Sequence, residues 1–226
     1  MTKSEELRLS RLEAVIEIQN LQGRYNHYLS MGIFDRVLEM FSQKDPNIKM
    51  EIADSGLYVG RESIGRWLAE SIKPKHRSRG GMGLMMLSTP VIEVGKDGKS
   101  ARGMWHSFGC TASRDEKGVR ACWQQGKYDN EFVKEHGKWK FRSIHWYINF
   151  RTPFEEGWAK KQITGSATAP GIRPDGPSTY FMPYNPDACN EFWPPPPEPE
   201  QEEPDNTSDS QTEEEPQKDS SPETEQ

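Results

Sequence analysis

The chain of 226 residues has no apolar stretch that approaches the roughly 20 consecutive residues needed to span a bilayer. Its N-terminus, MTKSEELRLSRLEAVIE, is charged and periodic, unlike the apolar core of a signal peptide. The three cysteines, Cys110, Cys122 and Cys189, are odd in number and lack CxxC spacing, which argues against a disulfide framework. We therefore expect a cytoplasmic protein with reduced thiols and no membrane partner.

The motifs of metal-dependent, phosphate-binding and serine-nucleophile enzymes are also missing. No two of the five histidines stand at i, i+2 or i, i+4, and there is no HExxH or GxSxG motif. The glycines of RGGMG (79–83) follow a basic loop and precede a strand, which is the wrong context for a phosphate loop. The basic stretch KPKHRSR (73–79) is more typical of a solvated loop than of a nucleic-acid site. These absences predict no metal, no cofactor and no nucleic-acid partner.

The formal charge of −6 comes from the C-terminal end of the chain. Residues 198–226 hold twelve acidic residues, one lysine and no hydrophobic residue, whereas residues 1–197 hold 28 Lys and Arg against 23 Asp and Glu. A segment of this composition cannot bury enough apolar surface to offset its loss of conformational entropy. We therefore predict a folded domain over residues 1–158, an extended segment rich in Pro, Gly and aromatic residues over 159–197, and a disordered acidic tail over 198–226.

Three helices are predicted in the first third of the chain. The first covers about residues 4–31 and ends near Gly32, the second is a short helix at 34–41, and the third covers 61–72. The apolar residues that we expect on the inward face of the first helix are Leu12, Val15, Ile16, Leu21, Tyr25, Tyr28 and Leu29.

Strands dominate the rest of the domain. Residues 48–60 favour two short strands around a turn, and four long strands follow between residues 84 and 150. The turns between these long strands are marked by GKDGKS, RDEKG and EHGK. Helices followed by a strand meander indicate an α+β fold, in which a curved antiparallel sheet packs against three N-terminal helices.

Four segments together resemble the SnoaL-like group of the nuclear transport factor 2-like superfamily, over about residues 8–150. They are LQGRYNHYLSMGIFDRVLEMF, YVGRESIGRWL, TPVIEVGKDGKSARGMW and GKYDNEFVKEHGKWKFRSIHW. The resemblance implies a cone-shaped domain that encloses a deep apolar pocket, a hydrophobic small-molecule substrate, and a homo-oligomer (dimer or trimer). Members of the superfamily include dehydratases, ketosteroid isomerase, cyclases, cofactor-free lyases of aromatic compounds, and proteins that only bind other proteins.

The chain departs from the dehydratase-like members at two positions. Ser30 stands near the place of the Asp that those members usually carry after the tyrosine of the first helix, and Met85 stands near the place of a usual His. Both departures remove a group that handles protons. They favour a retro-aldol-type loss of a small aldehyde over a loss of water.

Two strand histidines are candidates for the general acid or base. Side chains alternate between the faces of a strand, so His145, Tyr147, Asn149 and Arg151 are predicted to share one face, about 7 Å apart. That row fits the polar floor of an aromatic pocket, although His145 could equally be a hydrogen-bonded core residue. The second candidate is His106, and only one of His106 and its neighbour Trp105 can point into the pocket; the sequence does not decide which.

Tyrosines complete the predicted site. Tyr25 and Tyr28 stand at i, i+3 on the first helix, where the resemblance implies hydroxyls that point into the pocket. The predicted catalytic residues are His145, His106, Tyr25 and Tyr28. The predicted substrate-binding residues are Tyr128, Tyr147, Asn149, Arg151, Trp105 and Trp123.

The predicted function is that of a cofactor-independent lyase. Its substrate would be a hydrophobic, hydroxylated aromatic molecule, and the reaction would be a loss of water or a retro-aldol-type loss of a small aldehyde. Both reactions need only proton transfers and a polarising site. A ketosteroid-isomerase-like or cyclase-like enzyme and a non-catalytic binding protein are the alternatives.

Overall fold

A computed structural model describes residues 2–73, 77–163 and 172–200, so the predicted acidic tail and His76 of the basic loop lie almost entirely outside the described residues. Helix α1 spans Lys3–Met31, begins with a capping box between Thr2 and Glu5, and ends at Gly32, whose φ of 69° lies in the left-handed region. Helix α2 spans Phe34–Glu39, and helix α3 spans Gly60–Arg66 and continues as the π-helix η1 (Trp67–Ile72). The three predicted helices are confirmed.

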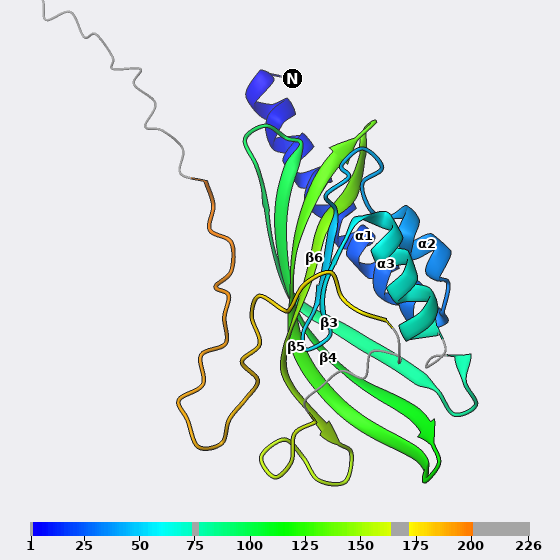
Figure 1. Cartoon of the computed structure of the whole chain (residues 1–226). Coiled ribbons are helices and arrows are strands. Elements are labelled where there is room, and N and C mark those ends of the chain that lie inside the picture. The colour runs from blue at the N-terminus through cyan, green and yellow to red at the C-terminus, as the bar shows by residue number, and fades with distance from the viewer. Residues whose placement is uncertain (1, 74–76, 164–171, 201–226) are drawn as a thin grey trace, which may run out of the picture.

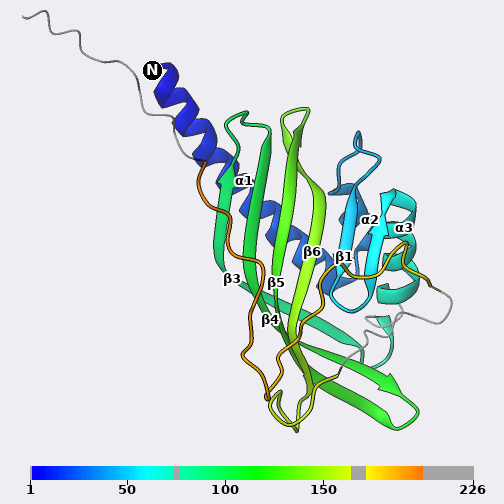
Figure 2. The same cartoon turned by 60° about the vertical axis from the view of Figure 1, so that its left-hand side comes forward.

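The buried side of α1 differs from the predicted one in the first half of the helix. Leu12 and Ile16, which we expected to face inward, are 64% and 60% exposed. Ala14 and Ile18 in the same turns are 2% and 0% exposed, so Leu12 and Ile16 lie on the side of α1 that faces away from the sheet. The first turns of the helix also extend beyond the sheet (Figures 1 and 2). The buried residues of the helix are Ala14, Ile18, Leu21, Gln22, Tyr25 and Asn26.

Six strands form one curved sheet in the order β2-β1-β6-β5-β4-β3. Their bounds are Lys49–Ile52 (β1), Gly56–Val59 (β2), Met82–Val94 (β3), Ser100–Asp115 (β4), Gly118–Glu135 (β5) and Lys138–Pro153 (β6). All neighbouring strands are antiparallel except β1 and β6, which run parallel. The parallel pair is possible because β2, α3, η1 and β3–β5 separate these two strands in the chain.

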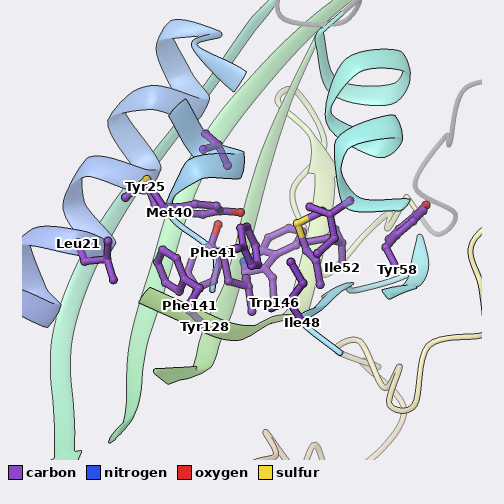
Figure 3. Packing of buried hydrophobic residues seen from close by; sticks show 14 of the residues in the cluster. Leu21, Tyr25, Met40, Phe41, Ile48, Ile52, Tyr58, Tyr128, Phe141 and Trp146 are labelled. Carbon is purple, nitrogen blue, oxygen red and sulfur yellow. The ribbon is translucent and has the colours of Figure 1, made fainter. Parts of the chain in front are cut away.

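The helices lie on the concave face of the sheet, and the C-terminal segment 172–200 runs along the opposite face (Figures 1 and 2). The core fills the space between α1, α2 and the sheet. Figure 3 shows Tyr25 of α1 next to Tyr128 and Phe141 of the sheet, and the ring centroids of Tyr25 and Phe141 are 5.4 Å apart. Side chains on the concave face therefore meet the helices, and those on the convex face meet the C-terminal segment.

The β5–β6 pair contains two bulges. Arg142 and Asn149 each have no partner residue on β5, and the register shifts at both positions. Each extra residue reverses the face of the side chains that follow it. The inward residues of β6 are therefore Trp139 and Phe141 before the first bulge, then Ile144, Trp146 and Ile148, and then Arg151 after the second. The prediction that His145 and Arg151 share a face is wrong for this reason.

The C-terminal segment covers polar groups on the convex face. The hydroxyl and backbone N–H of Thr179 donate to the carboxylate of Glu51, and Nε2 of His145 lies 3.2 Å from the same carboxylate. Burial raises the pKa of Glu51, but the contacts with His145 and Thr179 outweigh it and leave this pKa below its usual value. Glu51 is therefore a buried anion that stabilises the packing of the segment on the sheet.

A lysine makes a second attachment of the same segment. The ammonium group of Lys127 donates to the backbone carbonyls of Phe192 and Pro194, at 2.8 Å for Pro194. Burial lowers the pKa of Lys127. A buried anion and a buried cation on the same face thus both use the C-terminal segment to replace the water that they lose on folding.

The bulge at Asn149 leaves no room for a side chain on the strand opposite. A Cβ added at Gly126 would lie 2.0 Å from the carbonyl oxygen of Tyr147. We predict that Gly126→Ala lowers the free energy of unfolding by about 1–3 kcal/mol or more, because the strands must separate to admit the methyl group. Urea unfolding followed by circular dichroism measures this change.

Gly23→Ala is the matched control. A Cβ at Gly23, inside α1, meets no atom within 4 Å, so we expect it to stabilise the protein by about 0.5–1 kcal/mol through helix propensity. Equal effects of the two substitutions would contradict the close contact at Gly126.

The lowered pKa of Glu51 predicts a pH-dependent effect of Glu51→Gln. A carboxyl with a lowered pKa in the folded state stabilises the fold above its unfolded pKa of about 4.3, and this stabilisation is lost as pH falls through the folded value. The variant should therefore have a lower Tm than the unmodified protein at pH 7, and the difference should shrink in acid. Glu131→Gln, on an exposed side chain of β5, should change Tm little at either pH. A Tm loss in Glu51→Gln that is the same at pH 7 and pH 3 would refute this role.

Candidate active site

A cavity of about 240 Å³ lies between α1, η1 and the concave face of the sheet. The bent end of the sheet beyond the bulge at Asn149 forms one wall, and the last turns of α1 form another. Most of its lining is apolar, as in a typical small-molecule site. Apolar residues that line it include Leu29, Ile52, Trp67, Met85, Trp146 and Ile163.

The polar lining consists of hydrogen-bond donors and neutral groups. Among the described residues, no histidine, aspartate or glutamate lines the cavity. The site therefore differs from one built around a carboxylate–imidazole pair. The polar residues of the lining include Tyr25, Tyr128, Asn26, Gln124, Arg120 and Arg151.

Tyr25 and Tyr128 form a buried pair. They are 1% and 5% exposed, their rings meet edge to face with centroids 6.0 Å apart, and their hydroxyl groups share a hydrogen bond. Burial raises the pKa of both phenols; the nearby Tyr128 raises that of Tyr25 further, while the hydrogen bond from Tyr25 partly offsets the rise for Tyr128. Both hydroxyls therefore keep their protons at neutral pH and can donate a hydrogen bond or a proton, but not act as resting bases.

Arg151 is held in place on three sides. Its Nη1 lies 3.3 Å from Oδ2 of Asp54, its Nε donates to Oε1 of Gln124 at 3.2 Å, and its guanidinium lies 6.0 Å from the ring centroid of Trp146. Only 14% of the Arg151 side chain is exposed. A guanidinium fixed in this way presents a cation to the cavity without the loss of side-chain entropy that a free arginine would incur on binding.

Cys122 is a neutral group of the same wall. Burial raises the pKa of its thiol, and the positive charges of Arg120 and Arg151 oppose that rise without cancelling it. The thiol therefore stays protonated at neutral pH, and it is a poor nucleophile in this state.

Three of the residues predicted from the sequence line the cavity: Tyr25, Tyr128 and Arg151. Two others lie near it but not in its lining. Tyr28 packs against the core, and Trp105 is buried with its ring centroid 6.1 Å from that of Phe132.

The structure places the other predicted site residues on the convex face. His145 lies beside Glu51 and stacks on Tyr147 with centroids 3.7 Å apart. His106 is exposed and Asn149 donates to Oε1 of Gln125. Trp123 also lies outside the lining, packed between Phe108 and Phe154. The sheet therefore separates both strand histidines from the cavity.

Asn26 and Arg120 are among the polar lining residues that the sequence did not single out. Asn26 follows Tyr25 directly, and Gln22 and Asn26 stand at i, i+4 on the buried side of α1. Two amides at that spacing on a buried helix face are a recognisable pattern, because a buried amide requires a partner. For Arg120 the sequence carries no comparable pattern.

The described parts of the chain contain neither a cluster of metal ligands nor a membrane-spanning helix. There, no group of three or more His, Cys, Asp or Glu side chains could hold a metal ion. No helix in the same ranges is long and apolar enough to cross a bilayer.

Comparisons with solved structures show what the chain is similar to. The crystal structure of hexachlorocyclohexane dehydrochlorinase LinA-type3 from Novosphingobium barchaimii LL02 superposes with a TM-score of 0.55 at 16% identity, covering 65% of this chain and 94% of that one. A protein from Novosphingobium aromaticivorans DSM 12444, whose assignment as a scytalone dehydratase is provisional, gives 0.54 at 15% identity, with 71% and 97% covered. At these identities the likeness shows the fold alone.

Sequence comparison identifies the family. No protein with a curated description matches the chain significantly. The family model of the SnoaL-like domain matches residues 10–145, which contain most of α1, the whole of β1 to β5 and the first half of β6. That match covers more than half of the chain and confirms the resemblance of the four segments. The protein belongs to the SnoaL-like domain family.

Proposed function

We propose that the protein is a cofactor-independent lyase acting on a small hydroxylated aromatic compound inside this cavity. The observation that carries the proposal is the buried, hydrogen-bonded pair of Tyr25 and Tyr128, which sits in an otherwise largely apolar pocket. In such a pair one phenol donates to the other, which leaves a protonated hydroxyl free to donate to a substrate.

The size of the cavity limits the substrate. A cavity of about 150 Å³ holds benzene, so about 240 Å³ is enough for one aromatic ring with short oxygen-bearing substituents. The aromatic walls of Trp67 and Trp146 suit a flat ring. We infer a single-ring phenol or enol with a hydroxyl group on a side chain.

The two protonated tyrosines favour a reaction that begins with ionisation of the substrate. A phenolic or enolic proton leaves to water, and the electron pair on that oxygen expels a hydroxyl from the side chain, which departs as water with a proton from a tyrosine. In the retro-aldol form, the side-chain hydroxyl loses its proton to water, a carbon–carbon bond breaks to release an aldehyde, and the tyrosine protonates the carbon left behind and then recovers a proton from water. Dehydrochlorination, the reaction named for one structure of this fold, is also an elimination.

A panel of single-ring hydroxylated aromatics, assayed for released water-loss products and aldehydes by chromatography, tests this function. We expect Tyr25→Phe and Tyr128→Phe to lower kcat by about 100-fold or more on the best substrate, as expected for loss of an acid. Tyr180→Phe is the matched control: Tyr180 lies on the convex face, where its ring packs near Tyr147, and the substitution should leave kcat unchanged.

His145→Ala tests whether the strand histidine takes part in catalysis. Because the sheet lies between His145 and the cavity, we expect this variant to keep its kcat while losing some stability with the Glu51 contact. Unchanged kcat in both Tyr25→Phe and Tyr128→Phe would sink the proposal. Isomerised or cyclised products without water or aldehyde loss would assign the pocket to those reactions instead, and tight binding without any product would make the protein a binding module.

A further inference from the structure

A chain of three buried amides connects the sheet to the cavity. Asn130 and Gln22 are 0% exposed and Asn26 is 8% exposed. The backbone N–H of His145 donates to Oδ1 of Asn130 at 3.2 Å, and Nδ2 of Asn130 donates to Oε1 of Gln22 at 2.7 Å. Nε2 of Gln22 then donates to Oδ1 of Asn26 at 3.2 Å. We call these three side chains the amide relay.

The first link fixes the direction of all the others. A backbone N–H can only donate, so the group of Asn130 that faces it must be the oxygen. That choice leaves the NH₂ of Asn130 for Gln22, and the NH₂ of Gln22 for Asn26. Reversal of the three amides would place donor against donor at His145 and leave buried groups unsatisfied, which is costly. The backbone N–H of His145 thus fixes the orientation of the Asn26 amide, although Asn130 and Gln22 lie between them.

Asn26, the last amide of the relay, has one polar group without a partner among the described residues. Because Oδ1 of Asn26 faces Gln22, its Nδ2 lies on the other side, and this nitrogen is buried with no hydrogen-bond partner among the described residues. Asn26 lines the cavity, next to Tyr25 in the chain. Buried amide donors are rarely left without an acceptor in native proteins. A ligand in the cavity can supply the missing acceptor.

We propose that Nδ2 of Asn26 donates a hydrogen bond to a phenolate or enolate oxygen of the bound substrate, and that Gln22 and Asn130 are positioning residues that hold this donor toward it. The inference rests on the proposed function, since it names the group that would stabilise the charge developed in that reaction. It also states a substrate class, because a donor fixed in this way favours an oxyanion over a neutral group of the same shape. A hydrogen bond to a charged acceptor is stronger than one to a neutral acceptor.

Two fluorinated probes of similar shape separate this role from a merely structural one. Pentafluorophenol is ionised at neutral pH, and pentafluorotoluene carries no charge or acceptor oxygen; ¹⁹F NMR titration of the full chain gives a Kd for each. We expect Asn26→Ala to weaken pentafluorophenolate by about tenfold to a hundredfold and to change pentafluorotoluene by less than about twofold. The matched control is Asn190→Ala, which removes an amide from the C-terminal segment on the opposite face of the sheet and should change neither Kd.

Asn130→Asp tests the relay without touching the cavity. The ionised carboxylate that this substitution introduces accepts from both sides, so Gln22 and then Asn26 must reverse, and Oδ1 of Asn26 would face the probe. Burial raises the pKa of the new carboxyl, and its protonated form still donates to Gln22. We therefore expect the phenolate Kd of this variant to approach that of the unmodified protein in mild acid and to rise with pH, whereas the unmodified protein shows no such trend. Gln22→Glu should behave in the same way and replaces Asn130→Asp if that variant does not fold.

The binding measurements test the donor role of Asn26 separately from the lyase activity. Equal weakening of both probes in Asn26→Ala, or no weakening of either, overturns the donor role even if the panel finds a lyase substrate. A phenolate Kd that does not depend on pH in either relay variant overturns the positioning roles of Gln22 and Asn130. Selective loss of phenolate binding with no turnover of any panel compound supports the donor and refutes only the lyase.

Discussion

The register of β6 against β5 is the constraint on which the rest of the structure depends. Regular alternation would place all odd-numbered residues of β6 on one face, but the extra residues Arg142 and Asn149 reverse the alternation twice. The strand bends at each bulge, and the sheet curves around α1 instead of lying flat against it. The second bulge also turns Arg151 inward, where it meets Asp54 and Gln124. The cavity and the fixed cation of Arg151 therefore have the same origin.

Curvature also gives the sheet two buried faces with different requirements. On the concave face, α1 and η1 supply apolar cover, and polar groups bond to one another in the tyrosine pair and the amide relay, which leaves Nδ2 of Asn26 without a partner among the described residues. On the convex face, the C-terminal segment meets Glu51 and Lys127 with a hydroxyl, an N–H and two carbonyls. Apolar residues of that face outside the segment stay exposed, among them Met86, Phe108 and Phe154. An exposed apolar surface of this kind favours the predicted homo-oligomer, which stays a prediction.

The sequence predicted the helices and strands correctly, but it did not predict which side chains of each element face inward. Helix boundaries followed from periodicity and Gly32, and the strands followed from the turns between them, because both depend on residues close together in the chain. The family resemblance then supplied the sheet curvature and the expectation of a pocket. The bulges depend on which residue of β5 opposes which residue of β6, and that register is a tertiary property. His145, Tyr147 and Asn149 were consequently grouped with Arg151, although the sheet lies between them. Tyr25 was placed correctly because α1 has no bulge, whereas Leu12 and Ile16 of the same helix were assigned to the wrong side.

The residues that line the cavity indicate which reactions a pocket without a carboxylate and an imidazole could support. Ser30 and Met85 line the cavity near the places where relatives would carry Asp and His, so the charge-handling pair is absent from these positions rather than moved elsewhere in the described lining. What remains are donors whose protons are held firmly: two phenols with raised pKa values, a fixed guanidinium and an amide whose direction is set by a main-chain N–H. Donors of this kind stabilise an oxyanion and do little to remove a proton from carbon. Under the proposed function, the substrate must carry its own acidic hydroxyl, since the ionisation of that group replaces the base that is absent from the described lining. The proposed phenolic or enolic substrate thus agrees with the Ser30 and Met85 of the lining.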